Sequence, residues 1–314
     1  RWFMPIHNPK ATSLVRVLTA VWIVLSSGCA PEVPSKKVLL IGIDGVRTDI
    51  LASANTPNID KLAENGFFTD NAWTRPPTVS GPGWSNMLTG VWPDKHLVEG
   101  NDFSGNNYRS YSDFLTLIEQ AEPSLETVAV VNWLPLGGED SGGPVISDAI
   151  DTMIAFDGYE TGYTLADERG VALAVEQLTE SDPDLLFVYL GNTDMVGHEF
   201  GSLSEEYRLE VENADRLVGV LVDAVRGRPS FSGEDWLILI STDHGRRDDG
   251  GHGGDSEEER RIFFLASGPS VTGLEPEDKV QIVDVAPTAL AHLGIAVEDR
   301  WKLDGRVVGL STVD

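Results

Sequence analysis

Cysteine, basic residues and long apolar runs are all scarce in this 314-residue sequence. A single cysteine excludes an internal disulfide framework. Only 23 Lys and Arg stand against 50 Asp and Glu, a net charge of −27, so binding of a nucleic-acid polymer through a basic patch is excluded as the main function. At 41% hydrophobic residues the chain can still bury a full core, which excludes general disorder. Its length suits one large domain or two ordinary ones of about 100–200 residues each.

The first residues of the chain have the features of a secretory signal. Lys10 and Arg16 precede the apolar run 17–25, and the small residues 26–28 follow it. That run has nine residues, whereas a helix that crosses a bilayer needs about 20. A basic start, a short apolar stretch and a small-residue end are typical of a signal peptide, so we expect the protein to be exported.

The residue that ends this segment indicates which kind of signal it is. Residues 25–29, Leu-Ser-Ser-Gly-Cys, resemble a bacterial lipobox, in which Cys29 is lipidated and becomes the mature N-terminus. We therefore expect residues 1–29 to be a signal peptide of the lipoprotein type, 30–37 a tether and 38–314 a single domain. The protein would lie in the periplasm or cell envelope, with membrane contact only through the lipid on Cys29. An ordinary signal peptide with an incidental cysteine is the alternative.

From residue 38 onward, apolar runs alternate with helical patterns. Uncharged runs predict strands buried on both faces, at residues 38–43, 127–131, 185–190, 236–240 and 262–266. Spacing and end signals predict helices at residues 56–65, 205–225 and 283–293. This alternation predicts an α/β fold with a largely parallel central sheet and helices on both faces. Ligands in such sheets bind beyond the carboxyl ends of the strands.

Carboxylate and imidazole side chains follow three of the predicted strands. They are Asp44, Asp194, His198, Asp243, His244 and His252. Because the carboxyl ends of parallel strands meet at one edge of a sheet, we expect these side chains to lie together there. A single Asp at a strand end is more often a turn residue, but six such groups with neighbouring glycines favour a metal site. This donor set suits zinc, or a harder ion such as Mn²⁺.

Ser80 is the candidate nucleophile. It lies in residues 78–90, Thr-Val-Ser-Gly-Pro-Gly-Trp-Ser-Asn-Met-Leu-Thr-Gly, where we expect a helix to begin at Ser80. The free N–H groups of a helix N-terminus favour phosphate and a serine alkoxide. A serine hydroxyl needs a base or a metal to deprotonate it, and since no histidine is spaced as an obvious base, metal activation is the better hypothesis. Thr78 is the rival nucleophile.

In their order along the chain, these residues resemble the alkaline phosphatase superfamily. The pattern is most similar to its nucleotide pyrophosphatase/phosphodiesterase branch, in which a Thr or Ser nucleophile is followed two residues later by Pro, here Ser80 and Pro82. Asn101 falls where that branch keeps a phosphate-binding Asn. The Gly-His-Gly-Gly segment around His252 also resembles the phosphoethanolamine transferases of the superfamily.

The resemblance implies an alkaline phosphatase-like catalytic domain with two divalent metal ions, zinc or alternatively manganese. One ion would be surrounded by Asp44, Ser80, Asp243 and His244. The other would be held by Asp194, His198 and His252. Ser80 would attack phosphorus in line between ions about 4 Å apart and form a phosphoseryl intermediate. Asn101 and the backbone N–H of Gly81 would hold a non-bridging oxygen.

Two positions depart from related patterns. Sulfatases of the superfamily need Cys or Ser followed by x-Pro-x-Arg, but Trp84 stands at the Arg position, which argues against sulfatase maturation. Trp84 would either stack on a flat leaving group or pack beneath the helix. Leu97 replaces the Gly that usually follows the histidine at position 96. We expect His96 to order its loop and His292 to be structural.

The expected function is an exported hydrolase of phosphodiester or nucleotide-type pyrophosphate bonds in a small-molecule phosphate ester. No Arg is assigned to the phosphate, which favours a diester over the more highly charged monoester. The alternatives are a phosphomonoesterase or a phosphoethanolamine-type transferase, and then a sulfatase-like hydrolase. A non-catalytic binding protein comes last, because none of the six expected acid and imidazole ligands is missing from the sequence.

Overall fold

The computed structural model describes residues 2, 4, 33–273, 276 and 278–311. The expected lipidation site Cys29, nearly all of the expected signal peptide and residues 30–32 lie outside the described residues. The chain divides into two units, Arg1–Val33 and Pro34–Asp314, and the second contains all the strands and helices that follow. No helix in the part of the chain that the structure describes is long and apolar enough to cross a membrane.

The second unit is built on a seven-stranded sheet with the strand order β2-β7-β6-β1-β5-β3-β4. The strands are β1 (Ser35–Ile43), β2 (Gly66–Trp73), β3 (Thr127–Val131), β4 (Thr152–Ala155), β5 (Leu185–Leu190), β6 (Glu234–Ser241) and β7 (Arg261–Ser267). Within it, β7 runs antiparallel to both of its neighbours, β6 and β2, and the other pairings are parallel. The predicted α/β fold with a largely parallel sheet is therefore confirmed.

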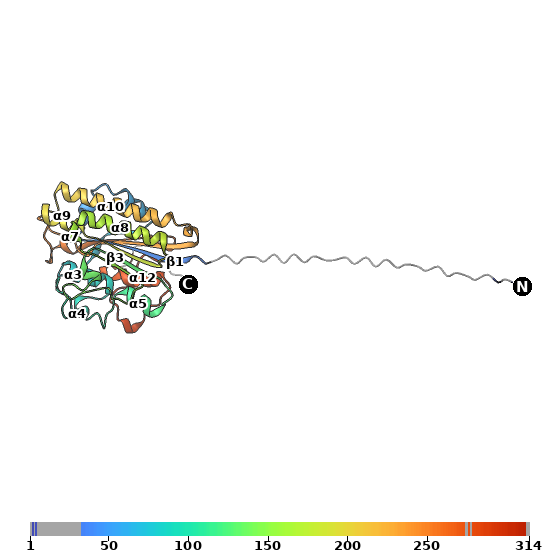
Figure 1. Ribbon diagram of the computed structural model, residues 1–314. Coiled ribbons are helices and arrows are strands. Elements are labelled where there is room, and N and C mark those ends of the chain that lie inside the picture. The colour runs from blue at the N-terminus through green and yellow to red at the C-terminus, as the bar shows by residue number, and fades with distance from the viewer. Residues whose placement is uncertain (1, 3, 5–32, 274–275, 277, 312–314) are drawn as a thin grey trace. The chain divides into compact units, whose positions relative to one another are not determined.

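Helices cover both faces of this sheet. They are α1 (Thr48–Leu51), α2 (Pro57–Glu64), α3 (Ser80–Thr89), α4 (Pro93–His96), α5 (Phe114–Ala121), α6 (Leu134–Gly137), α7 (Gly158–Thr161), α8 (Tyr163–Glu180), α9 (Asn192–Phe200), α10 (Glu205–Arg226), α11 (Glu257–Arg260) and α12 (Val285–His292). In Figure 1, α8 and α10 lie on one face of the sheet, and α3, α5 and α12 lie on the other.

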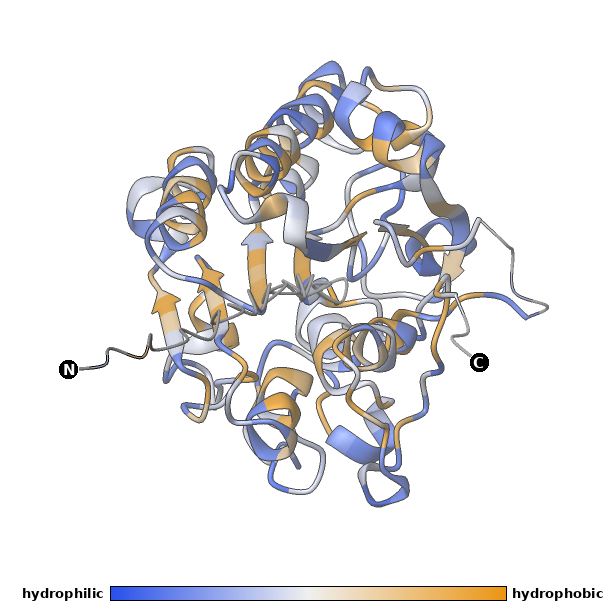
Figure 2. Ribbon diagram, turned by 90° about the vertical axis from the view of Figure 1, so that its right-hand side faces the viewer, coloured by the Kyte–Doolittle hydropathy of each residue, from blue (hydrophilic) through white to orange (hydrophobic). Residues whose placement is uncertain are grey.

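The apolar core consists of two clusters, one on each face of the sheet. Along β1, Val38 and Leu40 belong to the cluster beneath α3, whereas Leu39 and Ile41 belong to the cluster beneath α10. Successive side chains of a strand point to opposite faces, so a strand covered on both sides is apolar at every position. This is why the strands of the sheet interior are largely orange in Figure 2 and were recognisable in the sequence.

Several elements and one boundary differ from the expectation, among them the helices α5 and α8 and the strands β2 and β4, which were not predicted. The helix α8 was missed because its buried face is made largely of small and polar residues such as Ala166, Asp167 and Gly170, which produce little apolar periodicity. The strands β2 and β4 were missed because they are sheet edges that are only partly buried. Residues 35–37 of the expected tether are the start of β1, because they pair with β6 from Glu234 onward.

Candidate active site

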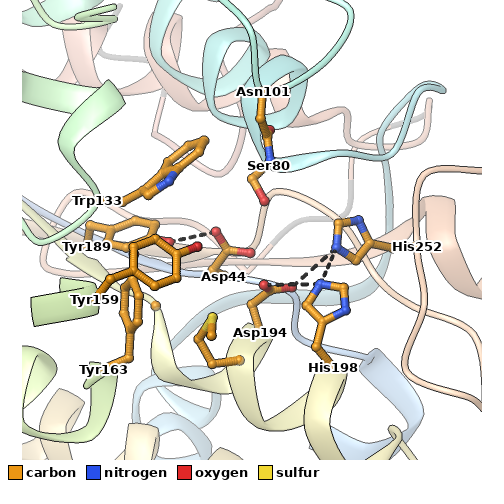
Figure 3. A pocket seen from close by; sticks show the side chains of 12 residues that line it. Asp44, Ser80, Asn101, Trp133, Tyr159, Tyr163, Tyr189, Asp194, His198 and His252 are labelled. Carbon is orange, nitrogen blue, oxygen red and sulfur yellow. Dashed lines mark hydrogen bonds and ion pairs between the residues drawn. The ribbon is translucent and has the colours of Figure 1, made fainter. Parts of the chain in front are cut away.

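The six predicted ligands meet at one edge of the sheet. The strand β1 lies between β5 and β6 and runs parallel to both, so the carboxyl ends of the three strands are adjacent. Asp44 follows β1, Asp194 lies in the first turn of α9 after β5, and Asp243 follows β6. Figure 3 shows Asp44 and Asp194 side by side below Ser80.

Asp194, His198 and His252 form the first cluster of ligand atoms. Each offers one atom within 4.8 Å of the other two. The Nε2 atoms of His198 and His252 are 2.9 Å apart, and they lie 3.4 Å from Asp194 Oδ2 and Oδ1, respectively (Figure 3). His252 Nδ1 donates a hydrogen bond of 2.8 Å to the carbonyl oxygen of Thr78. The lone pair of Nε2 is therefore available to bind a metal ion.

Asp44, Asp243, His244 and Ser80 form the second cluster. His244 Nε2 lies 3.6 Å from Asp44 Oδ1, 3.3 Å from Asp243 Oδ2 and 3.4 Å from Ser80 Oγ. Both of these carboxylate oxygens are buried without a hydrogen-bond partner among the described residues. Because buried oxygens rarely go unpartnered, these atoms fit a bound divalent cation. Asp194 also lies within 4.8 Å of Asp44 and His244, so it stands between the two clusters.

The electrostatics of the clusters agree with their geometry. Burial, and then the neighbouring charge of Asp194, raise the pKa of Asp44 to about 7. Burial and the charge of Asp44 raise the pKa of Asp243 well above its ordinary value. Burial lowers the pKa of His244 far below its ordinary value, so this imidazole is neutral and able to bind a metal. Like-charged carboxylates held together out of water are stabilised by cations, and the carboxylate and imidazole donors fit zinc or manganese.

Ser80 is the first residue of α3. All ten residues of this helix are buried, and the helix ends at Gly90, whose φ of +66° an L side chain rarely adopts. A Cβ at Gly81 would lie 2.1 Å from the carbonyl oxygen of Gly100, so the loop that carries Asn101 packs directly on the first turn.

Asn101 lines the pocket above Ser80 (Figure 3). The backbone N–H of Gly81 donates a hydrogen bond of 2.8 Å to Asn101 Oδ1. That N–H was expected to share the phosphate with Asn101, but in this structure it holds the Asn101 side chain instead. The Nδ2 group of Asn101 is the donor that remains for a substrate.

The hydroxyl of Thr78, the rival nucleophile, is used in hydrogen bonds within the protein. This hydroxyl donates to the carbonyl oxygen of Gly254 at 2.9 Å and accepts from Gly253 N at 3.0 Å. The carbonyl oxygen of Thr78 holds His252, as described above. Thr78 therefore holds the loop of His252 against the segment that leads to the candidate nucleophile Ser80.

Trp84 packs beneath the helix. It is completely buried, and its Nε1 donates a hydrogen bond of 2.9 Å to Asp44 Oδ2, which excludes stacking on a leaving group. His96 is buried and bonded to Asn86 Oδ1 and to the backbone N–H of Val98 within its own region. His292 bonds to the carbonyl oxygen of Asp235 and does not line the pocket.

A cavity of about 440 Å³ opens beside Ser80 and has an aromatic wall. That wall consists of Trp133, Tyr159, Tyr163 and Tyr189 (Figure 3). The Tyr189 hydroxyl donates a hydrogen bond of 2.8 Å to Asp44 Oδ2. Reasoning from the sequence did not single out these four residues, because a buried aromatic residue usually belongs to the core. The available signal was the position of Tyr189 near the end of a strand, five residues before Asp194.

The sheet, the serine at a helix N-terminus and the two clusters of acids and imidazoles define an alkaline phosphatase-like protein. The family described as Type I phosphodiesterase / nucleotide pyrophosphatase matches residues 38–249. The chain belongs to this family, as the resemblance of its sequence predicted.

Similar proteins agree with this assignment. The chain is 27% identical over 225 residues to an uncharacterized pyrophosphatase/phosphodiesterase of Schizosaccharomyces pombe, which covers 66% of this chain and 44% of that protein. It is 26% identical over 242 residues to ectonucleotide pyrophosphatase/phosphodiesterase family member 7 of Mus musculus, which covers 73% of this chain and 55% of that protein. The chain thus spans about half the length of the curated relatives it matches.

Solved structures share the fold at low sequence identity. A 2-O GAG sulfatase superposes with a TM-score of 0.68 at 15% identity, over 87% of this chain and 73% of that one. The murine ectonucleotide pyrophosphatase / phosphodiesterase 5 superposes with a TM-score of 0.64, also at 15% identity, over 84% of this chain and 96% of that one.

Proposed function

We propose that this protein is a two-metal hydrolase that cleaves phosphodiester or nucleotide-type pyrophosphate bonds in small molecules. One observation carries the proposal: Asp44 Oδ1 and Asp243 Oδ2, which have no hydrogen-bond partner within the described part of the chain, face His244 Nε2, and this atom lies 3.4 Å from Ser80 Oγ. Membership of the phosphodiesterase family supports the reaction class.

The two clusters would hold the metal ions. Asp44, Ser80, Asp243 and His244 would surround one divalent cation, zinc or alternatively manganese, and Asp194, His198 and His252 would hold a second. When bound, the ions would lower the pKa of the Ser80 hydroxyl and neutralise charge on the phosphate and on the leaving oxygen. His244 and His252 support this assignment, because each donates from Nδ1 to a backbone carbonyl and keeps Nε2 available for a metal ion.

The chain's own groups supply the rest of the chemistry. Ser80 Oγ gives up its proton to solvent and attacks phosphorus, so that the Oγ–P bond forms as the bond between phosphorus and the leaving oxygen breaks and the leaving oxygen takes up a proton from solvent. Asn101 Nδ2 donates to a non-bridging oxygen while charge accumulates there. A water molecule then attacks the phosphoseryl group, frees the Ser80 hydroxyl and releases the phosphate product.

The pocket supports a diester as substrate. None of its described lining residues is Lys or Arg, so nothing there adds positive charge for a dianionic monoester. The aromatic wall of Trp133, Tyr159, Tyr163 and Tyr189 offers apolar surface to a flat group of the ester.

Three p-nitrophenyl esters test this function: a phosphate diester, a phosphate monoester and a sulfate. We expect the diester to be cleaved fastest, and both chelation and Ser80→Ala to abolish the cleavage. Thr78→Ser, which keeps the hydroxyl that binds the Gly253–Gly254 segment, is the control and should remain active. Preference for the sulfate would overturn the proposal. Loss of all three activities in a protein that holds two ions would overturn it in favour of a transferase that needs an alcohol acceptor.

We also propose that the protein is exported to the periplasm or cell envelope and anchored there through lipid on Cys29. The basic, apolar and small-residue order of residues 10–29 supports this location. Labelling of the protein in cells with a radioactive fatty acid should mark the wild type and not Cys29→Ser. Export of both proteins without any label would favour an ordinary signal peptide.

A further inference from the structure

Arg246 is a fully buried cation that lies two residues after His244. Its guanidinium group donates to three acceptors. Nε bonds to the carbonyl oxygen of Gly45 at 3.0 Å, Nη1 bonds to that of Gly250 at 2.6 Å, and Nη2 bonds to Asp194 Oδ1. A buried arginine with its donors spread over three separate segments needs an explanation, because burial of a charge is costly unless it is paired.

Each of the three segments carries a proposed metal ligand. Gly45 directly follows Asp44, and Gly250 precedes His252 by two residues. Asp194 is itself a ligand, and it stands between the two clusters. The Arg246 guanidinium therefore connects, through hydrogen bonds, three segments that carry ligands of both candidate metal sites.

The surrounding residues are shaped around this side chain. A Cβ at Gly197 would lie 2.1 Å from Arg246 Nη1, and a Cβ at Gly45 would lie 2.6 Å from Nη2. The ring of Tyr207 lies 5.8 Å from the guanidinium carbon, and its hydroxyl donates to the same Gly45 carbonyl oxygen at 2.7 Å. The surrounding residues thus accommodate the Arg246 guanidinium and restrict it to one position.

We infer that Arg246 is a positioning residue that orients Asp194 and the His252 loop for the second metal ion. The inference rests on the proposed two-metal function. Arg246 does not line the pocket, so it acts through Asp194 rather than on the substrate. Carboxylates that bind metals are themselves held by hydrogen bonds, and loss of such a partner typically weakens metal affinity about 10–100-fold.

The geometry indicates which of the two sites depends on Arg246. The site formed by Asp194, His198 and His252 receives two of the three guanidinium contacts, one to a ligand and one to the loop of another ligand. The other site receives only the contact to Gly45, beside Asp44. Loss of Arg246 should therefore weaken one ion selectively.

Zinc titration of the full chain by calorimetry, with metal content measured by mass spectrometry, tests the inference. The wild type should bind about two ions per chain. Arg246→Met should keep one ion at wild-type affinity and bind the other about 10–100-fold less tightly. Arg246→Lys retains the charge but cannot reach all three acceptors at once. Its zinc affinity at the dependent site should therefore lie between that of the wild type and that of Arg246→Met.

Arg228→Met is the matched control. Arg228 is also a buried arginine, but its partners are Glu234, Asp182 and the carbonyl oxygen of Leu178, none of which is a proposed ligand. We expect this variant to bind both ions with unchanged affinity. If Arg246→Met does not fold, Gly197→Ala displaces the guanidinium without changing its charge and should weaken the same ion.

The outcomes separate the two proposals. A wild type that binds no zinc or manganese would overturn the proposed function. A wild type with two ions and a folded Arg246→Met with the same two affinities would overturn only the role of Arg246. Wild-type affinity in Arg246→Lys would also overturn it, because charge alone would then suffice.

Discussion

Trp84 Nε1 donates a hydrogen bond of 2.9 Å to Oδ2 of Asp44. The indole thereby fixes one oxygen of the carboxylate and leaves the other, Oδ1, turned toward His244 and without a hydrogen-bond partner among the described residues. The Trp84 side chain thus orients a carboxylate of the candidate metal site and does not contact a substrate. Tyr189 supplies a second bond to the same Oδ2 atom, at 2.8 Å.

The Tyr189 hydroxyl offers the cleanest test of how Asp44 is oriented. Tyr189→Phe removes only the hydroxyl, so we expect the zinc affinity to fall about 10-fold, as for loss of other partners of metal ligands. Loss of the hydrogen bond should also lower the free energy of unfolding by about 1 kcal/mol. Zinc titration and denaturant unfolding measure the two effects. Tyr163→Phe, also in the aromatic wall, is the control, and an equal loss of zinc affinity there would contradict the explanation.

Asn101 can be tested as the donor to the phosphate. Asn101→Asp keeps an oxygen for the Gly81 N–H but replaces the Nδ2 donor by an acceptor that bears negative charge. We expect kcat for diester cleavage to fall by about 10²-fold or more, because one donor to the developing charge is lost. Steady-state kinetics of the wild type, Asn101→Asp and Asn101→Ala measures this change in kcat. Near wild-type kcat in Asn101→Asp would mean that Asn101 serves only to order its loop.

Buried His96 should make stability depend on pH. Val98 N donates to Nδ1 at 3.1 Å, so Nε2 carries the hydrogen and donates to Asn86 Oδ1 at 2.9 Å. Burial lowers the pKa of His96 from 6.5 to about 4, so the unfolded chain binds a proton here before the folded chain does. This contribution to stability is complete above pH 6.5 and is lost as the pH falls to about 4, in total about 3 kcal/mol.

His96→Gln removes that titration. The variant should be less stable than the wild type at pH 7.5, because it loses the packing of the buried imidazole. The difference in free energy of unfolding between the two proteins should shrink as the pH falls toward 4.5. Denaturant unfolding at pH 7.5, 5.5 and 4.5 gives the required free energies. A difference that stays constant over this range would show that His96 is not responsible.

Leu97 lies in the left-handed region, with φ of +63°. Its side chain is 54% exposed, so it gains little burial in return for a conformation that costs an L residue about 1–2 kcal/mol. We therefore expect Leu97→Gly to stabilise the protein by about 1 kcal/mol after the greater entropy of glycine in the unfolded chain is counted. Leu97→Ala retains the strain and should bring no gain. Thermal unfolding compares the three proteins, and a lower melting temperature for Leu97→Gly would contradict the prediction.

The order of elements was largely readable from the sequence because most strands of this sheet are covered on both faces. Continuous apolar runs predicted β1, β3, β5, β6 and β7, and acids one to four residues after three of these strands indicated the edge of the sheet where the site lies. The edge strands β2 and β4 lack this signal, since one side of each has no neighbouring strand and their side chains are only partly buried.

The residues that make up the site were predictable from the pattern of buried strands. The hydrogen bonds between these residues and their neighbours were not. The carboxyl ends of adjacent parallel strands bring Asp44, Asp194 and Asp243 together whatever the details of packing. The sequence by itself thus determined the α/β fold, the family and the set of acids, imidazoles and serine. Only the tertiary structure decided that Trp84 lies under Asp44 and that Arg246 joins three segments. Such contacts depend on side-chain directions between elements distant in sequence, and no local periodicity encodes them.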